Sequence, residues 1–280
     1  MTMPFPKTDL PKLMALPGTV RALALLASLR FVAEIDLARA AVRPGEIEEL
    51  GDEGLAFRLT LPRTALGRPA EPVLALTKAG AARLADLWDF EPESIPFETR
   101  SSCSRSAMFM DHGTATARFA ILLARELGPD TTTPLLSWED DPERLADSVH
   151  ILSGTDALGR TPLVGDGLAV VRGPRGPEGL LVEIDRGTER PGYIANKLRA
   201  YVEWWRLEGP RRRFDLPATR ILWVAPDARR AGKLRDIARE ATGGKASGLF
   251  WFAAEPDLLA EGITAPVWRT TKDEGLALWS

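Results

Sequence analysis

The chain is poor in the residues that build disulfides and zinc sites. Its 280 residues contain one cysteine, Cys103, and two histidines, His112 and His150. A single cysteine excludes an intramolecular disulfide and fits a reducing compartment. Two histidines exclude a histidine-rich zinc site, so carboxylates are the expected ligands of any bound metal ion.

Long hydrophobic runs are also missing. The longest apolar run near the start, residues 22–29, is too short to span a bilayer and is flanked by Arg21 and Arg30. No convincing signal-peptide cleavage site follows it. We therefore expect a cytoplasmic protein without a membrane partner.

The first third of the chain has the element order of a winged helix-turn-helix domain. After a proline-containing arm over residues 1–17, apolar residues at helical spacing predict three short helices between residues 18 and 50. Alternating apolar residues predict two paired wing strands, 55–59 and 72–76. Thr77 is expected to cap the helix that closes the domain.

Two functions fit this region, protein contacts (including a homodimer) and DNA binding. The third helix carries Glu46, Glu48 and Glu49, which makes it a poor surface to insert into a major groove. Phosphate contacts are expected instead from three arginines on or near the wing, namely Arg58, Arg63 and Arg68.

The remaining pattern predicts a second domain with a mixed sheet flanked by helices, and hence an α/β (α+β) fold. We expect domains over residues 1–90 and 108–280, joined by a linker over residues 91–107. The elements expected in the second domain are a helix over 108–127, a strand over 135–138, a helix from 141 to about 152, a hairpin of strands 163–172 and 179–185, a helix over 191–207, a strand over 220–225, a helix over 227–242, a strand over 248–253, a short helix near 257 and a terminal strand over 265–269.

Three carboxylates and a lysine are expected at the open ends of adjacent elements in that domain. Asp166 opens one hairpin strand, and Glu183 and Asp185 share a face at the end of the next. Lys197 lies on the following helix, beside its apolar stripe. Mg²⁺ prefers such oxygen ligands, and a lysine can orient an attacking water and stabilise charge on a phosphate. The alternative is that the carboxylates face solvent and that Lys197 is their surface ion partner.

The residues around these side chains resemble the replication-relaxation family of bacterial plasmid and mobile-element proteins. The resemblance is carried by Gly165-Asp166-Gly167, by the run EIDRGTE of residues 183–189, and by Lys197 and Tyr201. It implies a winged helix followed by a domain similar to the PD-(D/E)XK restriction-endonuclease-like fold. It also implies DNA as a partner, with replication or mobilisation proteins as further partners.

Carried over by position, Asp166 matches the first acid of that superfamily and Glu183 the second. The superfamily has a lysine two residues after the second acid, where this chain has Asp185. Either Lys197 replaces that lysine, or the site has lost cleavage and keeps only DNA binding. The first case implies an Mg²⁺-dependent endodeoxyribonuclease with Asp166, Glu183 and Asp185 at the metal. The second implies a non-catalytic replication adaptor.

A basic stretch between Arg206 and Lys245 is the second candidate for DNA contact. It has 11 basic and five acidic residues, in a chain with a net charge of −3. Such a local surplus suits phosphate contact, although a solvated helix face is the alternative. The side chains expected to contact DNA are Arg211, Arg212, Arg213, Arg229, Arg230 and Lys233. Trp204 and Trp205 are expected to pack in the core and at its rim.

Overall fold

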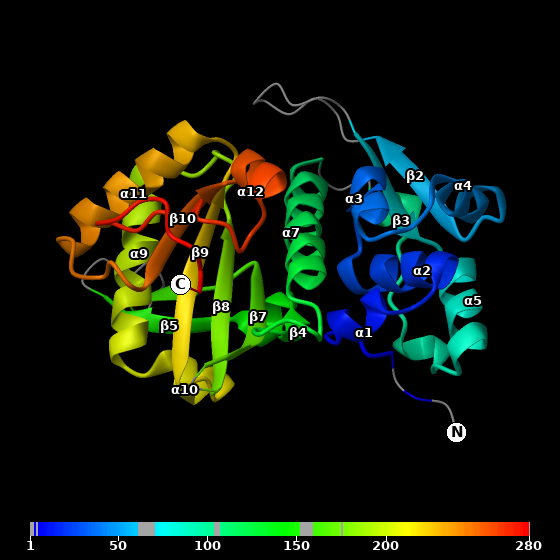
Figure 1. Ribbon diagram of the computed structural model, residues 1–280, viewed down its shortest axis with the longest axis horizontal. Coiled ribbons are helices and arrows are strands. Elements are labelled where there is room, and N and C mark those ends of the chain that lie inside the picture. The colour runs from blue at the N-terminus through cyan, green and yellow to red at the C-terminus, as the bar shows by residue number, and fades with distance from the viewer. Residues whose placement is uncertain are drawn as a thin grey trace. The chain divides into compact units, whose positions relative to one another are not determined.

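The computed structural model describes residues 3, 5–60, 71–103, 107–151, 159–174 and 176–279. They form two compact units, Met1–Gly128 and Pro129–Ser280, and each unit combines helices with a sheet (Figure 1). The chain therefore has a mixed α/β fold, as the sequence predicts.

The first unit is built from helices around a small antiparallel sheet of strand order β1-β3-β2. Its elements are α1 (Leu10–Met14), α2 (Gly18–Leu29), β1 (Val32–Ala33), α3 (Glu34–Arg39), α4 (Pro44–Asp52), β2 (Ala56–Thr60), β3 (Pro72–Leu76), α5 (Lys78–Trp88), the 3-10 turn η1 (Pro92–Ser94), α6 (Arg100–Cys103) and α7 (Ala107–Glu126). The Thr77 hydroxyl accepts a hydrogen bond from the Gly80 amide at 3.0 Å, which confirms the predicted cap of α5.

Two segments expected to be irregular contain helices. The N-terminal arm includes α1, because Pro11 lies in its first turn, where a proline costs no helical hydrogen bond. Leu10 and Leu13 bury the helix against the rest of the unit. The predicted linker over residues 91–107 likewise contains η1 and α6, and Ile95 between them is buried.

A buried ion-pair network fixes α7 within the first unit. Arg118 of α7 donates to Asp36 of α3 at 2.9 Å and to Glu71 at 2.8 and 2.9 Å. Arg39 also pairs with Asp36, at 2.5 Å. Burial raises the pKa of Asp36, while the two arginines act in the opposite direction. The helix that the sequence assigned to the start of the second domain thus groups with the first unit.

Replacing Arg118 with methionine should lower the free energy of unfolding of this unit by about 2 kcal/mol. Removing one partner of a buried ion pair usually costs ~3–5 kcal/mol. We expect a smaller loss here because Arg39 still pairs with Asp36. Urea unfolding at pH 7 measures it. The matched control is Arg125→Met on the same helix, because Arg125 is 45% exposed and lies 3.8 Å from Glu126. Equal losses in the two variants would contradict a stabilising role for the network.

The second unit contains a five-stranded mixed sheet of order β10-β9-β8-β7-β4. Strands β8, β9 and β10 are parallel, whereas β7 is antiparallel to both β8 and β4. The elements of the unit are β4 (Leu135–Glu139), α8 (Pro142–Leu145), β5 (Asp147–His150), β6 (Arg160–Leu163), β7 (Gly167–Gly173), β8 (Gly176–Ile184), α9 (Pro191–Arg206), α10 (Gly209–Phe214), β9 (Ala218–Ala225), α11 (Ala228–Thr242), β10 (Phe250–Ala254) and α12 (Glu255–Glu261).

Helices α9 and α11 lie side by side against one face of this sheet (Figure 1). Their apolar stripes, represented by Leu198 and Leu234, join Trp223 and Phe252 of the sheet in one buried cluster. The last six residues of β8 are all buried, as expected of a central strand covered on both faces. The end of β8 and the first turns of α9 are therefore both part of the buried interior of this unit.

Three elements of this unit differ from the prediction in their bounds or type. The helix expected from Asp141 ends at Leu145, and β5 follows, because Asp147 accepts a hydrogen bond from the Trp204 indole at 2.8 Å and β5 pairs with β6. The strand expected over 163–172 is divided into β6 and β7. In place of a terminal strand over 265–269, the structure has isolated bridges such as Phe252 with Arg269.

Candidate functional site

The candidate site is centred on a buried carboxylate near the end of β8. Glu183 is 3% exposed and pairs with two side chains of α9. Lys197 Nζ lies 2.5 Å from its Oε2, and the Tyr201 hydroxyl donates to its Oε1. Lys197 and Tyr201 are four residues apart, so one face of α9 presents both groups to the strand. The predicted pairing of Glu183 with Lys197 therefore forms, but inside the protein.

Burial dominates the electrostatics of this cluster. Burial raises the pKa of Glu183 to about 7, and Asp166 adds to the increase, while Lys197 and Tyr201 oppose it. Burial also disfavours the charged form of Lys197, but Glu183 and Asp166 together outweigh that effect and raise its pKa above the usual value. The ammonium group additionally lies 5.8 Å from the centre of the Trp223 ring. Lys197 thus stays charged, and Glu183 is the group that titrates near neutral pH.

Asp166 lies close to this pair, just before β7. Its amide donates to the Val182 carbonyl at 2.9 Å, and its Oδ2 accepts from the Ile184 amide at 2.7 Å. Both contacts extend the pairing of β7 with β8 and place the carboxylate beside the end of β8. The structure thus brings together three of the predicted site residues: Asp166, Glu183 and Lys197.

Asp185 belongs to a separate pair. Its side chain is completely buried, and the Arg230 guanidinium binds both carboxylate oxygens, at 2.6 and 2.9 Å. Arg230 also donates to the Glu189 carbonyl at 3.2 Å. This bidentate pair ties the end of β8 to the first turn of α11. Arg230, which the sequence assigned to DNA contact, is occupied here.

The carboxylates, as arranged, do not form a metal-binding group. Both oxygens of Glu183 and both of Asp185 have cationic or hydroxyl partners, and one oxygen of Asp166 accepts a backbone amide. Within the described part of the chain, no three Asp, Glu, His or Cys side chains are placed to hold a metal ion. Binding of Mg²⁺ by Asp166, Glu183 and Asp185 stays a prediction, and we assign no catalytic step to it.

The residues expected to contact DNA fall into three places. Arg58 of β2 forms an ion pair with Glu34 of α3, which neutralises part of its charge. Arg63 and Arg68 lie outside the described residues. The others belong to the second unit, where α10 leads into β9 and α11 follows it. The exposed side chains there that have no ion pair among the described residues are Arg211, Arg212, Arg213, Arg229 and Lys233.

These cations form two clusters. Arg211–Arg213 lie before the start of β9, whereas Arg229 and Lys233 lie beyond its end (Figure 1). A strand rises ~3.3 Å per residue, so the eight residues of β9 separate the clusters by about 23 Å. The basic stretch therefore presents two separate groups of exposed cations and not one patch.

Three functional candidates lie beyond the predicted set. Tyr201 could have been assigned from its spacing with Lys197. Glu189, in the EIDRGTE run, is half-buried beside Lys197 and Asp185, and burial raises its pKa. Trp205, expected to pack at the core rim, is 53% exposed, while Trp204 is buried as expected.

The sequence profile described as replication-relaxation matches residues 20–229. The chain belongs to the replication-relaxation family. The match includes every residue of the Glu183 cluster and most of both units. Comparison with curated proteins returned no match, and neither did comparison with solved structures. None of the helices described has the length and apolar character needed to cross a bilayer.

Proposed function

We propose that this member of the replication-relaxation family binds DNA of a plasmid or other mobile element, and that its buried acidic cluster has a structural role and does not cleave DNA. The observation that carries this choice is that both carboxylate oxygens of Glu183 already have hydrogen-bonding partners. The two partners are Lys197 and Tyr201, and the Glu183 side chain is itself only 3% exposed. This favours the adaptor over the nuclease.

Exposed cations support the DNA-binding half of the proposal. The two clusters of the second unit, Arg211–Arg213 and Arg229 with Lys233, present charges that carboxylates do not neutralise. Phosphate contacts release condensed counterions, so the affinity for DNA should fall steeply with salt. In the first unit, the Glu34 partner of Arg58 and the exposed acids of α4 make base readout by α4 a poor alternative.

The test combines cleavage and binding on the same substrates, which are supercoiled, linear and single-stranded DNA with Mg²⁺ or Mn²⁺. We expect binding without nicking. Replacing Arg211 and Arg212 with alanine should weaken binding about tenfold at 100 mM salt and reduce the salt slope by about two, because up to two phosphate contacts are lost. Arg213 is left in place because its guanidinium donates to the carbonyls of Glu143, Arg144 and Ala146.

The control removes three exposed acids of α4, with Glu48, Glu49 and Asp52 changed to alanine, and should leave the salt slope unchanged. Unchanged affinity and slope in the arginine variant would contradict the α10 contact. Metal-dependent nicking that disappears in Glu183→Ala would overturn the non-catalytic assignment and establish the nuclease.

A further inference from the structure

A cavity of about 670 Å³ lies at the opposite end of the sheet from the Glu183 cluster. It is bordered by the starts of β8 and β9, the last turns of α9 and the loop after α11. A second cavity of about 310 Å³ shares Trp205, Arg206, Pro217 and Thr219 with it, so the two adjoin. The larger volume lies within the range of ~300–1,000 Å³ that is usual for small-molecule sites.

The position of the cavity follows from the sheet register. Strand β9 begins at Ala218, but its first partner on β10 is Phe250, opposite Ile221. Over Ala218–Arg220, β9 therefore pairs with β8 on one side only, and its other side borders the cavity. At Gly179 of β8 the side chains of Leu216 and Thr219 pack directly on the strand, because a Cβ there would lie 2.8 Å from Leu216 Cδ1 and 2.9 Å from Thr219 Oγ1.

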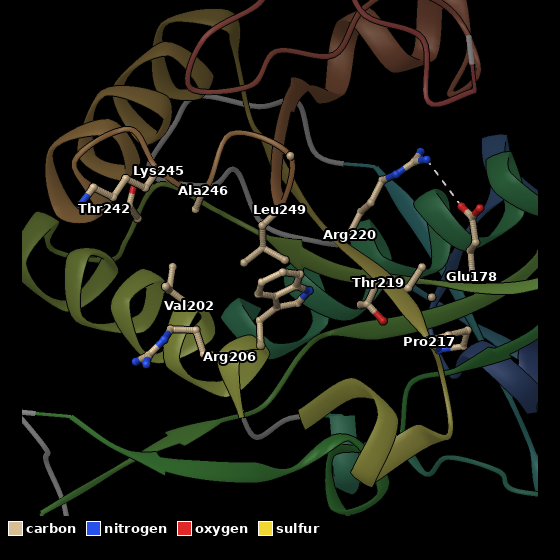
Figure 2. A pocket seen from close by; sticks show the side chains of 14 residues that line it. Glu178, Val202, Arg206, Pro217, Thr219, Arg220, Thr242, Lys245, Ala246 and Leu249 are labelled. Carbon is tan, nitrogen blue, oxygen red and sulfur yellow. Dashed lines mark ion pairs between the residues drawn. The ribbon is translucent and has the colours of Figure 1, made fainter. Parts of the chain in front are cut away.

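The lining of the cavity suits a ligand with a flat ring and a negative charge. Figure 2 shows Leu249 between the α9 side chains Val202 and Arg206 and the β9 side chains Thr219 and Arg220. Trp205, half-exposed at this wall, offers an aromatic face for stacking.

Cations outnumber carboxylates around the cavity. Its charged lining consists of Arg206, Arg220, Lys245 and Glu178. Arg206 pairs with Glu203 at 2.6 Å, and Arg220 pairs with Glu178 at 3.5 Å and lies 5.2 Å from the centre of the Trp251 ring. Lys245 is the cation of the lining that has no ion pair among the described residues. The surplus of positive charge favours an anionic ligand.

A buried polar atom provides independent support. Thr219 is 8% exposed, and its hydroxyl has no hydrogen-bond partner within the described structure. A buried hydroxyl without a partner costs ~1–3 kcal/mol, so proteins seldom leave one unsatisfied. The hydroxyl lies beside Gly179 and is sealed from solvent, but Thr219 lines both cavities, so a rotation of its side chain would present the hydroxyl to a bound ligand.

We propose that this cavity binds a nucleotide, either free or as an unpaired nucleotide of a DNA strand, with its base stacked on Trp205, its phosphate near Lys245 and Arg206, and a polar group hydrogen-bonded to Thr219. The proposal rests on the proposed function only for the strand as a source of the nucleotide. The affinity should depend on the aromatic ring, because base stacking on a side chain contributes ~1–3 kcal/mol per base.

The test measures binding of the full chain to a deoxynucleoside monophosphate and to a five-nucleotide single strand, by calorimetry. Trp205→Ala should weaken binding about tenfold or more, and Trp205→Phe should restore most of it. Thr219→Val, nearly identical in shape, should weaken binding about fivefold while leaving the thermal unfolding temperature equal or higher. Arg199→Ala, an exposed position of α9 outside the cavity, is the control and should bind normally.

The outcomes separate the two proposals. Binding of either ligand that falls in both Trp205→Ala and Thr219→Val establishes the pocket, and the ligand that binds identifies the source. If the strand binds but neither substitution weakens it, the pocket is wrong and the DNA-binding proposal stands. If neither ligand binds while duplex binding persists, the pocket is again wrong. If the unmodified chain binds the monophosphate but no DNA, the proposed function is wrong and the pocket stands.

Discussion

Lys197→Met should destabilise the second unit by about 4 kcal/mol at pH 8 and by less than about 1 kcal/mol at pH 4.5. The substitution keeps the length of the side chain but leaves the Glu183 carboxylate buried without its cation. Breaking a buried ion pair on one side typically costs ~3–5 kcal/mol. Urea unfolding at the two pH values measures the difference.

The pH dependence follows from the direction of the Glu183 shift. In the folded chain its pKa is about 7, above the ordinary value of 4.5, so folding favours the protonated form. The stabilising contribution of this group is complete below about pH 4.5 and is lost as the pH rises through 7, by up to about 3 kcal/mol in the unmodified protein. Without Lys197, which lowers the pKa of Glu183, the loss becomes larger and extends to higher pH.

A double variant provides the matched control. Glu183→Gln combined with Lys197→Met removes both charges, and the glutamine can still accept a hydrogen bond from Tyr201. We expect it to recover most of the stability at pH 8, since replacing a buried pair by neutral groups is often close to neutral. A Lys197→Met loss that is equal at pH 4.5 and pH 8, or that the double variant does not recover, would show that the charge of Glu183 is not its cause.

The local elements of the second unit were largely predictable from the sequence. The apolar stripe of α9 and the apolar run of β9 depend on neighbouring residues alone, and both elements were correct within two residues at each end. The convergence of Asp166, Glu183 and Lys197 also followed, because strand ends and the next helix must meet at one edge of the sheet. Burial of that edge did not follow, since it depends on β7 and β9 flanking β8.

Contacts between distant segments account for the errors. The helix expected after Asp141 was replaced by β5 because Trp204, 57 residues away from Asp147, fixes that strand. Asp185 was assigned to a metal site, but its partner lies 45 residues further along, on α11. One local signal was available: Arg230 precedes the buried Leu234 by four residues and so shares its face of the helix. Charge counting treated Arg229 and Arg230 as equivalent, although only the first faces solvent.

Arg230→Met and Arg229→Met should separate stability from DNA binding at adjacent positions. Arg230→Met leaves Asp185, whose side chain is completely buried, without either of its two hydrogen-bonded contacts to the guanidinium. We expect a loss of about 3 kcal/mol in the free energy of unfolding, measured in urea at pH 7. The affinity of the folded variant for duplex DNA should stay within about twofold, because the guanidinium points to Asp185 and not to a phosphate.

Arg229→Met should behave in the opposite way. Arg229 is exposed at the start of α11, so its removal should change stability by less than about 0.5 kcal/mol. It should weaken DNA binding severalfold and reduce the salt slope by about one, as expected for one phosphate contact. Reduced DNA affinity in a folded Arg230→Met variant, with unchanged stability, would restore Arg230 to the DNA-binding surface. Equal effects of the two substitutions on stability would contradict the pairing of Arg230 with Asp185 as the reason that α11 is anchored to β8.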